Sequence, residues 1–186
     1  MIGLIVVLVV VVVIVAWIAG LYNSLVRAKN EVGNAWSQID VQLNRRHDLI
    51  PNLVETVKGY MTHERETLEA VVRARQQAVQ ITGASVEDKA RVENALSQTL
   101  RSLFAVSENY PQLKANENFL ALQEELTSTE NKISFARQYY NDSVLNLNNR
   151  IQMFPTNIFA SAFNFKQAAF FEVEAPEARK PVAVKF

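Results

Sequence analysis

The two histidines are the side chains best suited to acid–base or metal chemistry in this sequence, and neither stands in a complete motif. His63 and Glu64 begin the H-E-x-x-H pattern of zinc proteases, but Thr67 occupies the place of the second histidine. His47 is followed by Asp48, and adjacent helical residues point in different directions, so this pair alone does not make a metal site. If the two histidines met across a turn, they could bind a metal together with carboxylates, and this alternative stays open.

Other catalytic and cofactor motifs are missing from the sequence. The chain has no cysteine, which excludes disulfides, thiolate nucleophiles, zinc–thiolate sites and iron–sulfur clusters. It has no G-x-S-x-G elbow, no G-x-x-x-x-G-K-[ST] phosphate loop and no G-x-G-x-x-G fingerprint. A di-iron bundle would need repeated Glu-x-x-His pairs, and the sequence contains none. We therefore predict that the protein is not an enzyme and has no catalytic residue, cofactor or metal.

The charge balance argues against nucleic-acid binding. The chain has 186 residues, with 19 basic and 19 acidic side chains, so its formal net charge is zero. Such a chain lacks the strong positive field that attracts nucleic acid, although a local basic patch could still exist. We expect no nucleic-acid partner.

A cluster of charged residues precedes a proline and has two interpretations. It contains Arg45, Arg46, His47 and Asp48, followed by Pro51. In the structural interpretation, these charged groups surround the proline and satisfy the carbonyl groups that it leaves without a partner. In the functional interpretation, they contact another subunit or a partner protein.

Helices must position these residues, and the first predicted element is a membrane anchor. The chain carries no charged side chain and no Asn, Gln, Ser or Thr up to Leu21. About 20 residues of helix span ~30 Å, which is the hydrocarbon thickness of a bilayer. Trp17 and Tyr22 lie near one end, where aromatic rings suit the membrane–water boundary. We predict a transmembrane anchor over residues 1–22.

A cleaved signal peptide is the alternative for this segment, but no basic stretch precedes the apolar run and no convincing A-x-A site follows it. The nearest basic residues, Arg27 and Lys29, lie after the run and are partly offset by Glu31. The positive-inside tendency then places the body in the cytoplasm and the N-terminus outside. The reverse topology stays open.

Residues 23–155 have the spacing of a helical bundle. From Leu25 onward, apolar residues recur at steps of three and four, which indicates helices with one buried face. The anchor is expected to continue into the first of them, with a kink or short break at Pro51. Ser85 and Asp88 resemble a capping box. Further helices are expected over about 62–81, from Ser85 to Pro111, and from Phe119 to Phe154. We predict an all-α protein: an N-terminal transmembrane helix continuing into an antiparallel bundle of long helices.

The remaining residues, 156–186, are predicted to form a phenylalanine-rich tail. Seven of the chain's ten phenylalanines lie between Phe154 and Phe186. Short extended segments are expected over 170–174 and 182–186. Such a tail either folds back over its own bundle or acts as an aromatic arm that docks onto a neighbouring subunit or the membrane surface, and both could hold.

Contacts between proteins are the expected use of these surfaces. Trp36 could belong to the core or to an interface. The candidate contact residues are Trp36, Arg45, Arg46, His47, Asp48, Phe163, Phe165, Phe170, Phe171 and Phe186.

Several segments carry a distinctive pattern: YNSLV at 22–26, AWSQIDVQL at 35–43, RRHDLIPNLV at 45–54, VKGY at 57–60, YPQLKANENF at 110–119, ARQYYN at 136–141 and PVAVKF at 181–186. Together they resemble the LemA family of bacterial membrane proteins over essentially the full chain. The resemblance implies a single-pass protein of the bacterial cytoplasmic (inner) membrane, with a short N-terminal anchor and an all-helical body. The family has no established catalytic activity, so these motifs do not indicate a reaction.

Two non-enzymatic functions are expected. The first is a membrane-anchored helical scaffold that self-associates into a higher-order assembly and organises or shapes the membrane, because anchoring in one plane raises the effective concentration of the copies. Its partners are the lipid bilayer and further copies of the chain. The alternative is an adaptor or regulator of another membrane protein, such as a membrane metalloprotease. A third class, an unrecognised enzyme, would depend on His47 and His63.

Overall fold

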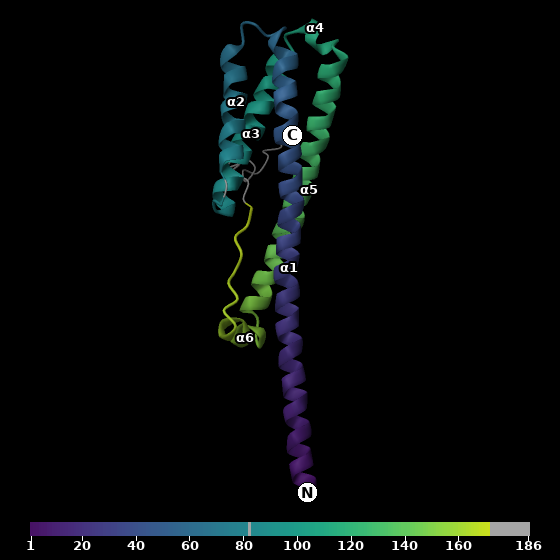
Figure 1. Cartoon of the computed structure of the whole chain (residues 1–186), viewed down its shortest axis with the longest axis vertical. Coiled ribbons are helices and arrows are strands. Elements are labelled where there is room, and N and C mark those ends of the chain that lie inside the picture. The colour runs from purple at the N-terminus through teal and green to yellow at the C-terminus, as the bar shows by residue number, and fades with distance from the viewer. Residues whose placement is uncertain (82, 172–186) are drawn as a thin grey trace, which may run out of the picture. The chain divides into compact units, whose positions relative to one another are not determined.

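The computed structural model describes residues 1–81 and 83–171, and all regular structure in these residues is helical. The all-α prediction is therefore confirmed (Figure 1). The chain divides into two units, which we call the anchor unit (residues 1–39 and 135–170) and the bundle unit (residues 40–134 together with 171). The helices are α1 (Ile2–Lys58), α2 (Arg65–Gln80), α3 (Val86–Ser107), α4 (Pro111–Lys114), α5 (Glu117–Gln152) and α6 (Thr156–Ala162).

The first helix continues through Pro51, so the short break expected there is wrong. A proline lacks the N–H group that would bind the carbonyl four residues earlier, which here belongs to His47. Arg75 on α2 donates its Nε hydrogen to that carbonyl oxygen at 2.7 Å. A side chain from a neighbouring helix thus replaces the missing backbone bond, whereas the structural interpretation assigned this role to the charged residues of the segment itself.

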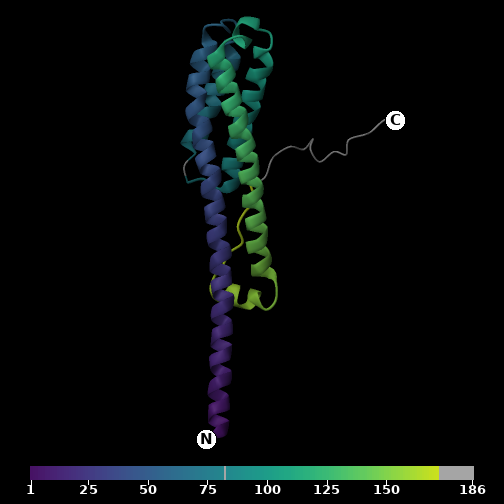
Figure 2. The ribbon, with the colours of Figure 1, turned by 90° about the vertical axis from the view of Figure 1, so that its right-hand side faces the viewer.

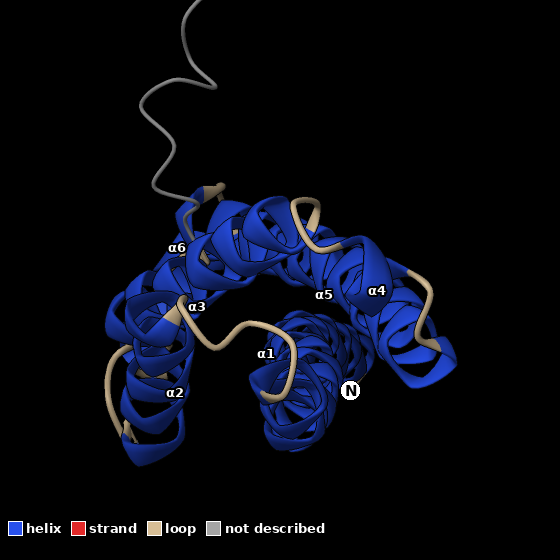
Figure 3. Cartoon of the chain, turned by 90° about the horizontal axis from the view of Figure 1, so that it is seen from above, coloured by secondary structure: helices blue, strands red, loops and turns tan. Residues whose placement is uncertain are grey.

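The bundle unit is built from antiparallel helices. The chain reverses direction between α1 and α2, between α2 and α3, and again before α5 (Figure 1). Seen from above, α2, α3 and α5 lie around α1 (Figure 3). Their facing sides form a buried apolar core, as steps of three and four require. Its members are Ile50, Leu53, Val57, Met61, Val71, Ala74, Ala78, Leu96, Leu100, Leu103, Leu113, Phe119 and Leu126.

Local sequence signals set the helix ends. Ser85 Oγ accepts a hydrogen bond from the Asp88 backbone N–H at 3.1 Å, which confirms the predicted cap of α3. Pro111 does not end α3 directly; that helix ends earlier, and Pro111 is the first residue of α4, a position where its missing N–H costs nothing.

In the anchor unit, the first part of α1 packs against the last part of α5. The rings of Trp36 and Tyr140 meet edge to face, with centroids 5.4 Å apart. Figure 2 shows α6 beside α1. The buried residues of this unit include Leu25, Ala28, Ala35, Ile39, Ala136, Tyr140, Val144, Leu147 and Ala160.

The tail begins with a helix, which the sequence reading did not predict. Asn164 closes α6 in a left-handed conformation, with φ of 56°. The backbone N–H of Phe165 donates to the Ala160 carbonyl at 2.9 Å, and that of Asn164 donates to the Ser161 carbonyl at 3.1 Å. These two bonds make a Schellman motif, which satisfies the last carbonyl groups of the helix.

After α6 the chain folds back onto α5. The Asn148 side chain binds both backbone groups of Ala168, with Nδ2 to O and N to Oδ1 distances of 2.9 Å each. Tyr140 Oη donates to the Ala169 carbonyl at 2.9 Å. The tail thus covers its own chain as far as residue 170, which is one of the two arrangements expected. Of the two extended segments expected in the tail, residues 172–174 of the first and all of the second, 182–186, lie outside the described residues.

Candidate functional site

Arg46 lies in the interior of the bundle unit because of its position along α1. It follows Leu43 by three residues and precedes Ile50 by four, and both are buried, so all three side chains point to the same face. The Arg46 side chain has no exposed surface. A buried guanidinium is tolerated only when its charge is paired and its N–H groups are hydrogen-bonded.

Residues of α3 and α5 supply partners for the two terminal nitrogen atoms of Arg46. Arg46 Nη1 donates to Ser97 Oγ at 2.7 Å and to Glu130 Oε2 at 2.6 Å. Arg46 Nη2 donates to the Glu93 carboxylate and, at 3.3 Å, to the Glu93 backbone carbonyl. One side chain therefore ties three helices together. We call Arg46, His47, Glu93, Ser97 and Glu130 the charge cluster.

His47 completes this cluster. Its Nε2 atom lies 3.1 Å from Glu93 Oε1, and both side chains are buried. Burial by itself raises the pKa of the Glu93 carboxyl, but the hydrogen bond from His47 and the charges of Arg46 and His47 outweigh it. The pKa of Glu93 is therefore below its ordinary value, and Glu93 is a carboxylate at neutral pH.

The cluster contains the residue types of a catalytic triad but is connected differently. Ser97 Oγ hydrogen bonds to Glu130 Oε1 at 2.7 Å and to the Glu93 carbonyl at 3.2 Å, not to His47. The carboxylates of Glu93 and Glu130 neutralise the guanidinium group of Arg46. Such an arrangement joins α1, α3 and α5 through one buried guanidinium group.

The two histidines have different surroundings. His63 is exposed in the connection between α1 and α2, whereas His47 is buried in the charge cluster. Within residues 1–81 and 83–171, no three His, Asp or Glu side chains gather closely enough to hold a metal ion. The sequence-based idea of a shared histidine–carboxylate metal site thus has no support in the described residues.

The lowered pKa of Glu93 predicts a stability contribution that depends on pH. Because the folded-state pKa is below the unfolded value, the contribution is full above the unfolded pKa and is lost as pH falls through the folded pKa. Wild type should therefore melt well above Glu93→Gln at neutral pH, and the gap should shrink on acidification towards about pH 3. Thermal melts followed by circular dichroism check this, with Glu125→Gln as the exposed control. A gap that stays constant down to that pH would contradict the assigned role of Glu93.

The other two charged residues of the 45–48 segment face outwards. Arg45 forms an ion pair with Glu125 on α5, and the two side chains are 48% and 40% exposed. Asp48 is exposed. The four predicted contact residues of this segment therefore lie on different faces of α1. Arg46 and His47 are buried, whereas Arg45 and Asp48 are exposed on the surface.

The remaining predicted contact residues lie mainly in the anchor unit. Trp36 is half-buried against Tyr140. The ring of Tyr22 packs edge to face on Phe163 and Phe165, with centroids 5.0 and 5.9 Å away. Phe170 is partly exposed in the anchor unit, Phe171 is buried in the bundle unit, and Phe186 lies outside the described residues.

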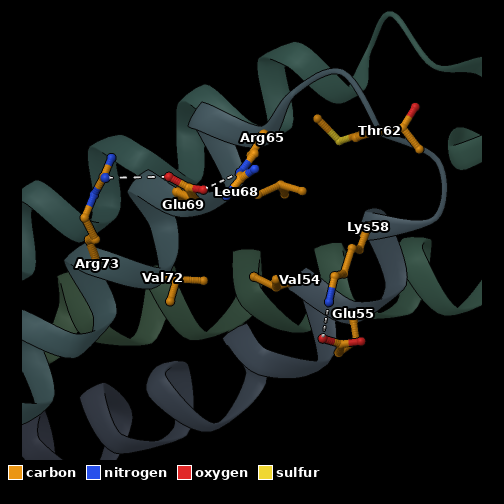
Figure 4. Close-up of a pocket in the computed structure, with 10 residues that line it drawn as sticks. Val54, Glu55, Lys58, Thr62, Arg65, Leu68, Glu69, Val72 and Arg73 are labelled. Carbon is orange, nitrogen blue, oxygen red and sulfur yellow. Dashed lines mark hydrogen bonds and ion pairs between the residues drawn. The ribbon is translucent and has the colours of Figure 1, made fainter.

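An apolar groove lies in the bundle unit between the end of α1 and α2 (Figure 4). Its volume is about 730 Å³. Val54 on α1 and Val72 on α2 face each other across it, and Leu68 adds to the apolar lining. Grooves of this kind accept the apolar face of a helix. The charge cluster does not contribute to this groove.

Charged residues form the rim of this groove. Arg65 Nε lies 2.6 Å from Glu69 Oε1, and Arg73 lies 3.8 Å from the same carboxylate. Lys58 pairs with Glu55 at 3.6 Å. The hydrogen bond and charge of Arg65 lower the pKa of the Glu69 carboxyl, so that it stays ionised. The rim has three basic and two acidic side chains and therefore a basic excess.

Sequence reasoning missed the partners of Arg46 and the groove. Glu93, Ser97 and Glu130 are 47 to 84 residues away along the chain. One signal was available in the sequence. Arg46 lies on the same face of α1 as Leu43 and Ile50, where an apolar residue is expected, and this predicts a buried charge that needs acidic partners.

Comparison with known proteins identifies relatives. The family model of the LemA family matches residues 35–186. Protein LemA of Metamycoplasma hominis is 29% identical over 161 residues, which cover 85% of this chain and 72% of that protein. The magnetosome protein MamQ of Magnetospirillum gryphiswaldense is 21% identical over 185 residues, covering 87% and 68%. The family match begins at Ala35, after the apolar start of α1.

Proposed function

The chain belongs to the LemA family, and we propose that it is a membrane-anchored, non-enzymatic helical scaffold whose copies associate through the bundle unit. The observation that carries this proposal is the accessible apolar groove of the bundle unit, combined with a charge cluster in which the Arg46 and Glu93 side chains are fully buried. The groove offers a binding surface, whereas the titratable groups are used for holding helices together.

The start of α1 supports membrane association. This helix has the length and apolar composition needed to cross a membrane, and its apolar window is fully exposed. The relative named as a magnetosome protein supports a membrane-associated role. Arg27 and Lys29 follow the apolar segment, which favours a body in the cytoplasm and an N-terminus outside, in the bacterial inner membrane.

The proposed occupant of the groove is α5 of a second copy. Glu117, Leu120 and Glu124 are exposed on α5, and their spacing places them on one helix face. Leu120 is 48% exposed and would enter the apolar groove. The two glutamates would meet the basic excess of its rim, so shape and charge both favour this pairing.

Anchoring places these two surfaces at the same level. Asn116 Nδ2 donates to Tyr60 Oη at 3.1 Å, and Tyr110 Oη donates to Glu64 at 3.3 Å. These bonds hold the start of α5 and the α1–α2 connection at the same end of the bundle unit. Parallel copies rooted in one membrane therefore bring groove and α5 face to equal heights, at a high effective concentration.

A groove that binds a different surface of the next copy makes a head-to-tail contact. Such contacts give rings where the rotation closes and open filaments where it does not. Either assembly would organise the membrane beneath it. The alternative function, an adaptor for another membrane protein, would use the same groove for a foreign helix.

Substituting one groove residue tests the proposal. Val72→Glu places a charge in the groove at a partly exposed position, so it should abolish higher assemblies while the fold is kept. Val79→Glu is the matched control, because Val79 lies on the same helix, is 47% exposed and does not line the groove. Native mass spectrometry of the full chain released from lipid vesicles counts the copies.

Two outcomes would contradict the proposal. The first is wild-type protein that is monomeric in vesicles at every protein density. The second is a Val72→Glu variant that assembles like wild type and like Val79→Glu. Loss of a single foreign partner from Val72→Glu, without a change in self-association, would establish the adaptor alternative instead.

A further inference from the structure

We infer that α6 and the turn before it form a second membrane contact, which lies in the headgroup boundary of an anionic phospholipid bilayer beside α1. This inference depends on α1 spanning the membrane and is independent of self-association. The segment that makes the contact is residues 151–165, which we call the foot.

The foot is attached to α1 at the membrane boundary. Trp17 packs edge to face on Phe159, with ring centroids 6.0 Å apart. Tyr22 packs on Phe163 with centroids 5.0 Å apart. Trp17 and Tyr22 mark the end of the apolar run, where aromatic side chains favour the interface. The foot belongs to the same unit as the part of α1 up to Ile39, and the ribbon places α6 beside α1 (Figure 2).

Large apolar side chains make up much of the outer surface of the foot, and its exposed polar side chains, Gln152, Asn157, Ser161 and Asn164, are uncharged. Met153, Phe154, Ile158 and Phe163 are all exposed, and Phe154 is 79% exposed. Phe163 contacts Tyr22, and Phe159 of α6 contacts Trp17, so this surface adjoins the end of the apolar segment that crosses the membrane. A patch of this kind in water would be unfavourable, whereas a bilayer would cover it.

The depth of the foot agrees with interfacial binding. Trp17 lies four residues before Leu21, which corresponds to about 6 Å along the helix axis. Interfacial helices bury their apolar face about 5–10 Å into the boundary between headgroups and acyl chains. The contact between Trp17 and Phe159 therefore holds α6 at the depth that such helices adopt.

Basic residues frame the foot and favour anionic lipid. Residues 151–165 contain no charged side chain, and Arg150 and Lys166 lie directly on either side of them. Arg27 and Lys29 add two more positive charges in the same unit, where the acidic residues are Glu31 and Asp142. Such positions allow basic side chains to reach phosphate groups while the aromatic rings stay below.

The absence of cysteine from the natural sequence allows a direct test. A spin label is attached to Phe154→Cys or to Phe135→Cys in the full chain, reconstituted in vesicles of phosphatidylcholine and phosphatidylglycerol. Phe135 is the matched control, because it is 73% exposed and belongs to the same unit. We expect the label at 154 to collide severalfold less with a water-soluble nickel complex, and more with oxygen, than the label at 135.

Shielding by a neighbouring copy gives a different result from shielding by lipid. A protein interface lowers collisions with both reagents, whereas a bilayer raises collisions with oxygen. The measurement is repeated in the Val72→Glu background, so that failure of the proposed assembly does not affect it, and at Ile158→Cys as a second position. Equal nickel accessibility at 154, 158 and 135, or low oxygen accessibility at 154, would overturn the inference.

Discussion

Replacing Arg46 by methionine is expected to lower the free energy of unfolding by about 3–5 kcal/mol, the cost of leaving a buried charge without its partner. Glu93 is fully buried and loses its guanidinium neighbour in this variant. Glu130 is 34% exposed and can be hydrated instead, so most of the loss arises at Glu93. Denaturant unfolding of the detergent-solubilised full chain, followed by circular dichroism, measures the difference from wild type.

The neighbouring arginine provides a matched control. Arg45 also pairs with a glutamate of α5, but both side chains are substantially exposed. Exposed ion pairs contribute about 0–1 kcal/mol, so Arg45→Met should have little effect. The same residue change at adjacent positions therefore separates burial of the charge from the loss of an arginine.

A double variant tests whether the penalty comes from the orphaned carboxylate. Replacing a buried ion pair by apolar residues of similar volume is often neutral or stabilising. Arg46→Met combined with Glu93→Leu should therefore recover much of the stability lost by Arg46→Met alone. Equal losses in Arg45→Met and Arg46→Met, or no recovery in the double variant, would show that the cluster is not the internal tie described above.

The helices were predictable because each is specified locally. Steps of three and four between apolar residues indicate one buried face, and Ser85 with Asp88 indicates the start of α3. The break at Pro51 was mispredicted for a tertiary reason. Arg75, on α2, donates a hydrogen bond to the carbonyl group that the proline leaves without a partner. The residues around Pro51 do not indicate that Arg75 will lie there.

The charge cluster was not predictable from charge counts, because most charged residues on helices are exposed. Arg46 differs in that it interrupts an apolar stripe between Leu43 and Ile50. Glu93 differs likewise, since it precedes buried Leu96 and Leu100 by three and seven residues on α3. Register therefore indicates which charges are buried, but which of them pair with each other follows from the packing of the helices.

The helix at the start of the tail was not predicted, because a helix of seven residues depends on packing that the local sequence does not indicate. Phe159 and Phe163 are four residues apart, which is the spacing of one helix face. Asn164 then supplies the left-handed residue that ends the helix. The packing of these rings on Trp17 and Tyr22 joins segments more than 130 residues apart in the sequence.

Two variants, Val72→Glu and Leu120→Glu, are expected to abolish assembly through the groove. Val72→Glu blocks the groove and keeps the α5 face, whereas Leu120→Glu blocks the α5 face and keeps the groove. Each variant alone should be monomeric, because every head-to-tail contact needs both surfaces. Leu120 is 48% exposed, so its replacement should leave the fold intact, as circular dichroism can verify.

Mixing the two variants in one membrane tests whether the groove of one copy binds α5 of another. One intact groove and one intact α5 face remain in a mixed pair, so the mixture should form pairs of two 21.0-kDa chains and nothing larger. Native mass spectrometry of the co-reconstituted vesicles measures this. A mixture that stays monomeric while wild type assembles, or one that regains the full wild-type size distribution, would contradict an assembly built from groove and α5.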